Sequence, residues 1–199
     1  MGWGVGVIWT MNTVEPIRNE DTILDFADYL KEKCMRDYVL FMSGIFLGLR
    51  ISDILPLKVR DVKNADYLFM TEKKTGKKDR IKINDELKQI YKEYIVGMRD
   101  YEFLFQPTRG RNRNHPITRQ RVWQILNEAA DKFEYKDPIG CHTLRKTFGY
   151  MIYNETKDAA ALQDIFRHAS IEYTKRYIGV NQDSKDRMMN KLSFGIKKR

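Results

Sequence analysis

The stretch His168-Ala-Ser-Ile-Glu-Tyr-Thr-Lys-Arg-Tyr177 ends in a tyrosine that follows a histidine by nine positions. Two other stretches carry residues of matching chemistry: His142-Thr-Leu-Arg145 and, far upstream, Gly48-Leu-Arg50-Ile-Ser-Asp53. Two arginines, two histidines and a tyrosine could together hold a phosphodiester and attack it, because each guanidinium can bond two phosphate oxygens at once. Each stretch is common by itself, so the prediction depends on their joint order and spacing.

These stretches resemble the sequence boxes of the tyrosine recombinases, the family of phage and mobile-element integrases. The resemblance runs from about Glu15 to about Leu192 and includes an arginine box at 47–53, a Lys-Thr-Gly turn at 74–76 and a histidine–arginine box at 142–148. Arg167 departs from the family pattern, because glycine usually precedes the second histidine. Glycine would permit a sharp turn at the end of the helix, so arginine makes such a turn before His168 less favoured.

The resemblance implies a role for the two arginines and the tyrosine. Arg50 and Arg145 would stabilise the negative charge that builds up on the phosphate in the transition state. Tyr177 would attack the phosphate and form a 3′-phosphotyrosyl bond. Because that bond keeps the energy of the phosphodiester, rejoining would need no ATP.

The resemblance also implies supporting roles for the other polar residues. His142 would help deprotonate the tyrosine or bond the phosphate, and His168 would add a hydrogen bond. Asp53 would orient Arg50. Lys74 would protonate the departing 5′ oxygen, although Lys73 and Lys77 lie close enough on the same turn to replace it.

Each of these residues also has an ordinary structural interpretation. On spacing alone, Arg50 and Asp53 form a surface ion pair, while His142 and Arg145 share a solvated helix face. Taken alone, Tyr177 is a side chain with a buried ring and a wet hydroxyl, and the turn lysine is simply solvated. The joint order of the boxes favours the catalytic interpretation.

The charge of the chain predicts a polyanionic partner. The 199 residues carry a formal net charge of +9, and nucleic acid is the commonest partner of such proteins. A solvated basic surface without a partner is the alternative. Arg109, Arg111 and Arg113 alternate with Gly and Asn in a predicted loop, which we expect to follow DNA phosphates.

The composition predicts neither a disulfide nor a cofactor. Cys34 and Cys141 are far apart and lack Cys-x-x-Cys spacing, which fits a reducing cytoplasm. No carboxylate, His or Cys cluster has metal-site spacing, so we expect no metal. The apolar residues 1–11 are too short to span a bilayer and lack the basic start of a signal peptide. We therefore expect no membrane partner, and a cytoplasmic protein associated with the nucleoid.

The pattern of apolar residues predicts a mostly α-helical domain with a small antiparallel β-sheet, the catalytic-domain fold of the tyrosine recombinases. We expect helices that begin at Asp21-Thr22, at Ser52-Asp53, after Asn84, after Thr118 and at His142. An apolar helix at 38–47 should stop at Gly48, and another should end near His168. Residues 67–71 and 80–83 should form a hairpin whose turn contains Gly76.

The domain prediction assigns residues 1–14 to a leader of uncertain origin and 15–199 to the catalytic domain, with the family's N-terminal core-binding domain absent. The resemblance implies a site-specific recombinase or integrase that acts on double-stranded DNA as a homo-tetramer. Two alternatives stay open: a catalytically silent DNA-binding module of the same fold, and a type IB topoisomerase-like enzyme that relaxes DNA.

Overall fold

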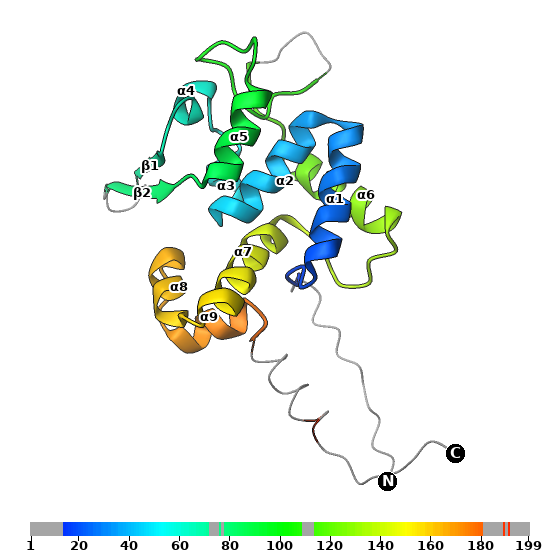
Figure 1. The fold of residues 1–199 in the computed structure, drawn as a ribbon, viewed down its shortest axis with the longest axis vertical. Coiled ribbons are helices and arrows are strands. Elements are labelled where there is room, and N and C mark those ends of the chain that lie inside the picture. The colour runs from blue at the N-terminus through cyan, green and yellow to red at the C-terminus, as the bar shows by residue number, and fades with distance from the viewer. Residues whose placement is uncertain are drawn as a thin grey trace.

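Helices make up most of the structure (Figure 1). The computed structural model describes residues 14–71, 76, 78–108 and 114–180, together with 189 and 191. The elements are α1 (Glu20–Lys33), α2 (Met35–Leu47), α3 (Ile51–Ile54), α4 (Val59–Val62), β1 (Tyr67–Thr71), β2 (Lys78–Lys82), α5 (Asp85–Tyr94), α6 (Arg119–Lys132), α7 (Cys141–Thr156), α8 (Ala159–Phe166) and α9 (Ile171–Tyr177). The predicted fold class, mostly α with a small antiparallel sheet, is confirmed.

Local capping explains where several helices begin. The side chain of Asn84 accepts a hydrogen bond from Leu87 N (2.9 Å), and that of Thr118 accepts one from Arg121 N (3.1 Å). Each satisfies a main-chain N–H that the first helical turn leaves without a partner. These predicted helix starts, at α5 and α6, are confirmed.

Two other predicted starts are wrong by one or two residues. Helix α1 begins at Glu20, because the side chain of Asn19 accepts a hydrogen bond from Asp21 N (2.8 Å). The capping residue therefore precedes the predicted Asp21-Thr22. Helix α3 begins at Ile51 after the extended residue Arg50, so Ser52 and Asp53 lie inside the helix.

Two hydrophobic clusters hold the helices together. The main core is formed chiefly by α1, α2, α5, α6 and the first half of α7, and α2 packs against α1, α5 and α7. The C-terminal cluster is smaller and gathers the second half of α7 with α8 and α9. Its buried side chains are those of Leu162, Phe166, Ile178 and Val180. In Figure 1, α8 and α9 lie together at the lower end of α7, away from α2 and α5 of the main core.

The hairpin is an antiparallel pair in which Tyr67 lies opposite Lys82 and Thr71 opposite Lys78. Strand β2 therefore begins two residues earlier than predicted and ends one residue earlier. Gly76 has a φ of 67° in the turn, a left-handed value that glycine adopts without strain. The hairpin projects from the side of the molecule in Figure 1.

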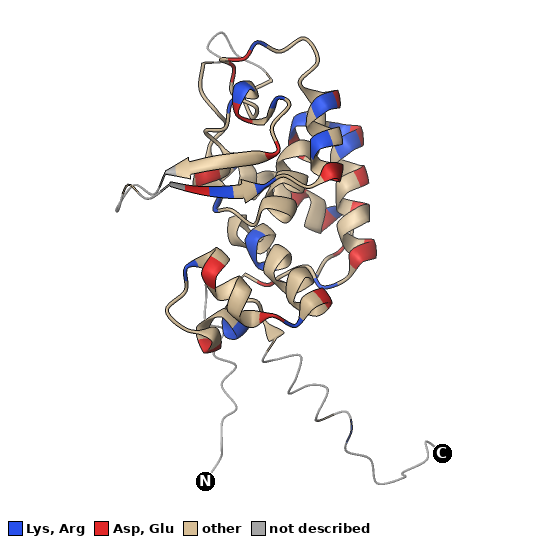
Figure 2. Cartoon of the chain, turned by 60° about the vertical axis from the view of Figure 1, so that its left-hand side comes forward, with Lys and Arg blue, Asp and Glu red and all other residues tan. Residues whose placement is uncertain are grey.

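The surface of the described chain mixes both signs of charge. Figure 2 shows Lys and Arg interspersed with Asp and Glu over the helices. All of the excess of Lys and Arg over Asp and Glu instead occurs in the sequence segments 72–77, 109–113 and 181–199. Among the described residues, none of the helices is long and apolar enough to cross a membrane.

Candidate active site

Gly48 brings the first arginine to the site. It ends α2 with a φ of 59°, and a Cβ atom at this position would collide with the ring of Phe148. Glycine is therefore required both by the left-handed backbone and by the close approach of α7. The chain turns here, and Arg50 follows as an exposed residue that precedes α3. The predicted role of Gly48 as a helix-ending turn is confirmed.

Two main-chain oxygens and an aromatic ring hold the side chain of Arg145 in place. Its side chain is only 5% exposed, and its guanidinium donates to the main-chain oxygens of Gly48 and of Phe166, the latter at 3.2 Å. The guanidinium carbon also lies 4.3 Å from the centroid of the Phe166 ring. Burial lowers the pKa of Arg145, and Tyr177 is the first group that raises it again. These contacts orient the planar fork before any substrate arrives.

Tyr177 is half-buried at the end of α9. Its ring lies edge-on to Phe166 (5.6 Å between centroids) and to His168 (5.0 Å). Burial raises the pKa of Tyr177, while the charges of Arg145 and Arg50 act in the opposite direction. Both arginines therefore lie close enough to stabilise a phenolate, the nucleophilic form of this side chain.

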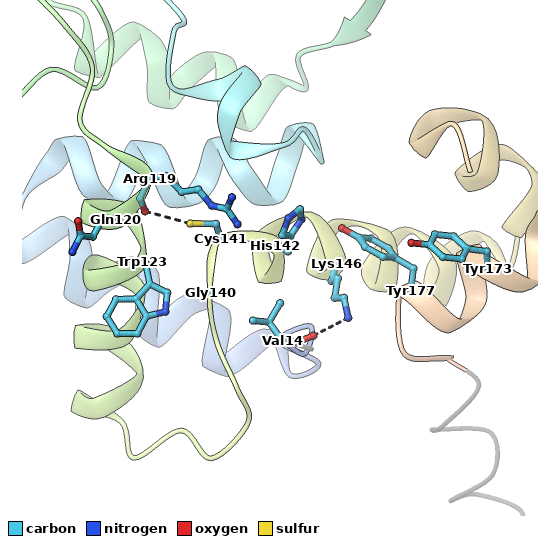
Figure 3. Close-up of a pocket in the computed structure, with 10 residues that line it drawn as sticks. All are labelled: Val14, Arg119, Gln120, Trp123, Gly140, Cys141, His142, Lys146, Tyr173 and Tyr177. Atoms are coloured by element: carbon cyan, nitrogen blue, oxygen red, sulfur yellow. Dashed lines mark hydrogen bonds between the residues drawn. The ribbon is translucent and has the colours of Figure 1, made fainter. Parts of the chain in front are cut away.

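His142 lies one helical turn before Arg145 on α7. Burial lowers its pKa first, and the charges of Arg119, Arg145 and Arg50 lower it further. A neutral imidazole is favoured as a result, and a neutral imidazole can accept a proton. In Figure 3 the hydroxyl group of Tyr177 is turned toward His142.

His168 is fixed by the turn between α8 and α9. Its Nδ1 lies 3.1 Å from the hydroxyl oxygen of Thr174, and its main-chain N–H donates to Gln163 O (3.0 Å). Burial lowers the pKa of His168, followed by the charges of Arg145 and Arg50. This second histidine thus belongs to the same electrostatic group as the two arginines.

The turn before His168 forms although arginine replaces glycine. Arg167 has a φ of 54°, a left-handed value that costs a non-glycine residue about 1–2 kcal/mol. Its side chain donates a hydrogen bond to Asp79 on β2 (3.0 Å). This contact joins the hairpin to the α8–α9 turn across 88 positions of sequence.

Of the other predicted site residues, the structure describes only Asp53. Asp53 accepts a hydrogen bond from Ser52 (3.4 Å), and its charge raises the pKa of Arg145. Its orienting role toward Arg50 stays a prediction. Lys74, Arg109, Arg111 and Arg113 lie outside the described residues, as do residues 1–13 of the predicted leader.

His142 and Tyr177 line one pocket of about 850 Å³ (Figure 3). Sequence reasoning missed several residues that share it: Val14, Arg119, Gln120, Trp123, Lys146 and Tyr173. A partial signal existed for two of them, because Lys146 follows Arg145 and Tyr173 lies one helical turn before Tyr177. Within the described residues, no group of three or more His, Cys, Asp or Glu side chains could hold a metal.

Comparison with known proteins identifies the family of the chain. Residues 18–184 match the phage integrase family. The chain belongs to this family. It is 49% identical to the probable integrase/recombinase YoeC of Bacillus subtilis (strain 168) over 174 residues, which cover 87% of this chain and 94% of YoeC. The predicted recombinase family is therefore confirmed.

Solved structures of lower identity share the fold of this integrase-family chain. The XerA recombinase is 20% identical with a TM-score of 0.68, over 90% of this chain and 66% of XerA. The integrase of transposon Tn1549, solved in complex with circular intermediate DNA, is 18% identical with a TM-score of 0.62. That match covers 84% of this chain and 62% of the solved Tn1549 fragment, residues 82–397. This chain thus spans about two thirds of each of the two solved chains.

Proposed function

We propose that this chain is a site-specific recombinase that cleaves and rejoins DNA strands through a covalent bond to Tyr177. One observation carries the proposal: Arg145 is buried and held by two main-chain oxygens, and its charge and that of Arg50 act on Tyr177. A fixed guanidinium and a second, exposed one beside a half-buried phenol are suited to bind a phosphodiester and stabilise its charge during attack.

The reaction needs one nucleophile and two proton transfers. The Tyr177 oxygen attacks phosphorus while His142 accepts the phenolic proton, which its lowered pKa permits. The bond to the 5′ oxygen breaks, and that oxygen takes a proton from Lys74, the role implied by the family resemblance. In the reverse step a 5′ hydroxyl attacks the phosphotyrosine and releases Tyr177. The phosphate-bound Arg50 and Arg145 stabilise the charge in both directions.

Double-stranded DNA is the partner that the charge distribution supports. The excess of Lys and Arg occurs in sequence segments that include Lys74 and the arginines at 109, 111 and 113. Contacts between such residues and phosphates supply most of the sequence-independent affinity for DNA. We extend the proposal to a homo-tetramer on DNA, as the family resemblance implies, and to association with the nucleoid.

The two alternative functions are less well supported. A silent DNA-binding module has no need to bury Arg145 beside Tyr177, yet the structure keeps that arrangement. A type IB topoisomerase would use similar chemistry, but the chain belongs to the phage integrase family. Relaxation of supercoiled DNA without exchange of partners would favour the topoisomerase.

Covalent capture tests the proposed function. The protein is incubated with fragments of its host genome in EDTA, denatured with detergent, and the DNA that stays attached is sequenced. We expect the unmutated chain to yield a specific site and Tyr177→Phe to yield no attached DNA. Tyr173→Phe is the matched control, because Tyr173 lies one turn away and lines the same pocket; it should retain the adduct. An adduct with Tyr177→Phe would refute the proposed nucleophile.

A further inference from the structure

Lys146 stands in the pocket without a part in the proposed reaction. Its half-buried ammonium donates a hydrogen bond to the main-chain oxygen of Val14 (2.7 Å) and lies 5.3 Å from the centroid of the Tyr177 ring. Long basic side chains normally extend their charged end into water. The ammonium of Lys146 is instead bound between a carbonyl and an aromatic ring (Figure 3).

The carbonyl that holds Lys146 belongs to a fixed segment. The N-terminal segment, residues 14–18, is bonded to the rest of the domain at two positions that follow Val14 O. Glu15 N donates to Pro138 O (2.9 Å), and Ile17 N donates to the buried hydroxyl of Thr147 (2.9 Å). Because its acceptor cannot move freely, the ammonium of Lys146 is preorganised against Tyr177.

The chain that follows Tyr177 packs on the same N-terminal segment. Gly179 has a φ of 80°, and a Cβ atom there would lie 2.8 Å from Arg18 Nη2 and 3.5 Å from Pro16 Cγ. Arg18 is itself bonded to Glu15 (2.7 Å). The N-terminal segment therefore supports the region around Tyr177 at two points. It packs directly against Gly179, and it holds Lys146, which lies against the Tyr177 ring.

Tyr177 needs such a support because α9 is short. The helix has seven residues and packs mainly on α8. A cation over an aromatic face contributes a modest stabilisation, larger when the pair is withdrawn from water. Its effect on rate can be greater, since a displacement of about 1 Å in an attacking group can cost about 100-fold.

We propose that Lys146 is a positioning residue: anchored on Val14 O, its ammonium holds the ring of Tyr177 in the orientation for attack. The inference rests on the proposed function of Tyr177. Lys146 also links the N-terminal segment to Tyr177, so a shift of residues 14–18 would displace the reacting oxygen of Tyr177.

Two variants separate the charge of Lys146 from its bulk. Lys146→Met keeps an unbranched side chain of similar length but removes the ammonium, while Lys146→Arg keeps a cation. Lys31→Met is the matched control, because Lys31 Nζ also lies 5.3 Å from a tyrosine ring, that of Tyr38, away from the pocket. Rates of adduct formation are measured in a single turnover on the captured DNA site with protein in saturating excess, beside DNA affinity and melting temperature.

We expect Lys146→Met to form the adduct about 10-fold more slowly with unchanged DNA affinity. Lys146→Arg should recover most of the rate, and Lys31→Met should match the unmutated chain. A Met variant of normal rate would overturn the inference. Weaker DNA affinity of Lys146→Met with a normal rate at saturation would also overturn it, because Lys146 would then be a DNA contact. A lower melting temperature that Lys146→Arg does not restore would overturn it as well, because the role of Lys146 would then be structural.

The same assay separates this inference from the proposed function. Tyr177→Phe is measured beside the lysine variants. If Tyr177→Phe still forms an adduct, the proposed function fails. If it forms none while Lys146→Met reacts at the normal rate, the role of Lys146 alone is refuted.

Discussion

The main core and the C-terminal cluster contribute different parts of the site. Arg50 follows α2, which packs within the main core, and Arg145 lies on α7, which joins the two clusters. Tyr177 belongs to the C-terminal cluster, whose fully buried members are only Leu162, Phe166, Ile178 and Val180 within the described chain. Arg50 therefore stands on the larger core and Tyr177, the proposed nucleophile, on the smaller one, while the guanidinium of Arg145 contacts Phe166 of the smaller cluster from a helix that both clusters share.

This difference has a consequence for dynamics. Hydrophobic stabilisation grows with the apolar area buried, at about 25 cal/mol per Å². A small cluster opens at lower free energy than a large core, and segments that move during function are usually drawn from the less stable part. We infer that α8 and α9 open more readily than α2.

The largest expected effect on the rate of adduct formation concerns Arg145, which we propose binds the phosphate. Arg145→Lys should slow adduct formation by about 100- to 1,000-fold, because one ammonium cannot reproduce a fork held by two carbonyls. Arg121→Lys on α6, where the arginine pairs with Glu128 on the surface, is the control and should react normally. A rate within tenfold of the unmutated chain for Arg145→Lys would remove this residue from the reaction.

The rules that succeeded from sequence were local. Gly48, Asn84 and Thr118 mark helix ends through a left-handed turn or a side-chain cap, which depends on a few neighbouring residues. The role of Lys146 could not be read in this way, because its acceptor lies 132 positions upstream. Only the packing of the N-terminal segment on α7 brings them together.

The candidate site shows the same limit. The family resemblance selected the residues around Arg145, and the structure brings both histidines, both arginines and Tyr177 into one electrostatic group. The residues contributed by α6, such as Arg119 and Trp123, carried no motif and entered the pocket through tertiary packing alone. Sequence periodicity identifies the face of a helix, but not what lies opposite.

A second prediction tests whether the two clusters open separately. Phe166 is 1% exposed in the C-terminal cluster, and Phe26 is 0% exposed in the main core. Replacing either with Ala should cost about 3–5 kcal/mol in the unit to which it belongs. By native-state hydrogen exchange, Phe166→Ala should weaken the protection of amides in α8 and α9 but leave that in α2 nearly unchanged. Phe26→Ala should weaken both. Equal loss in α2 for both variants would show a single cooperative unit.

A third prediction uses acid to weaken the smaller cluster. Burial lowers the pKa of His168 in the folded state, so the unfolded chain, with a histidine pKa of about 6.5, takes up its proton first. This stabilising contribution is complete above about pH 6.5 and is lost as pH falls through the lower folded pKa. Urea unfolding should give a smaller free energy at pH 5.5 than at pH 7.5. His168→Gln should reduce that difference.

The smallest expected effect concerns the turn that joins α8 to α9. Arg167→Gly and Arg167→Ala both remove the hydrogen bond to Asp79, but only glycine relieves the left-handed φ. The Gly variant should be more stable than the Ala variant by about 0.5–1 kcal/mol, measured by urea unfolding. Equal stability would mean that the strain of the left-handed turn is no larger than the extra backbone entropy that glycine loses on folding.

Tryptic mapping of the covalent adduct tests the central claim most directly. The unmutated protein is reacted with its captured DNA site, both components are digested, and the peptide that carries a nucleotide is sequenced by tandem mass spectrometry. Tyr173 and Tyr177 are both in the pocket, with ring centroids 6.4 Å apart. We predict the nucleotide on Tyr177 alone, attached through a 3′ phosphate. A nucleotide on Tyr173 or on any other residue, or a 5′ linkage, would contradict the account.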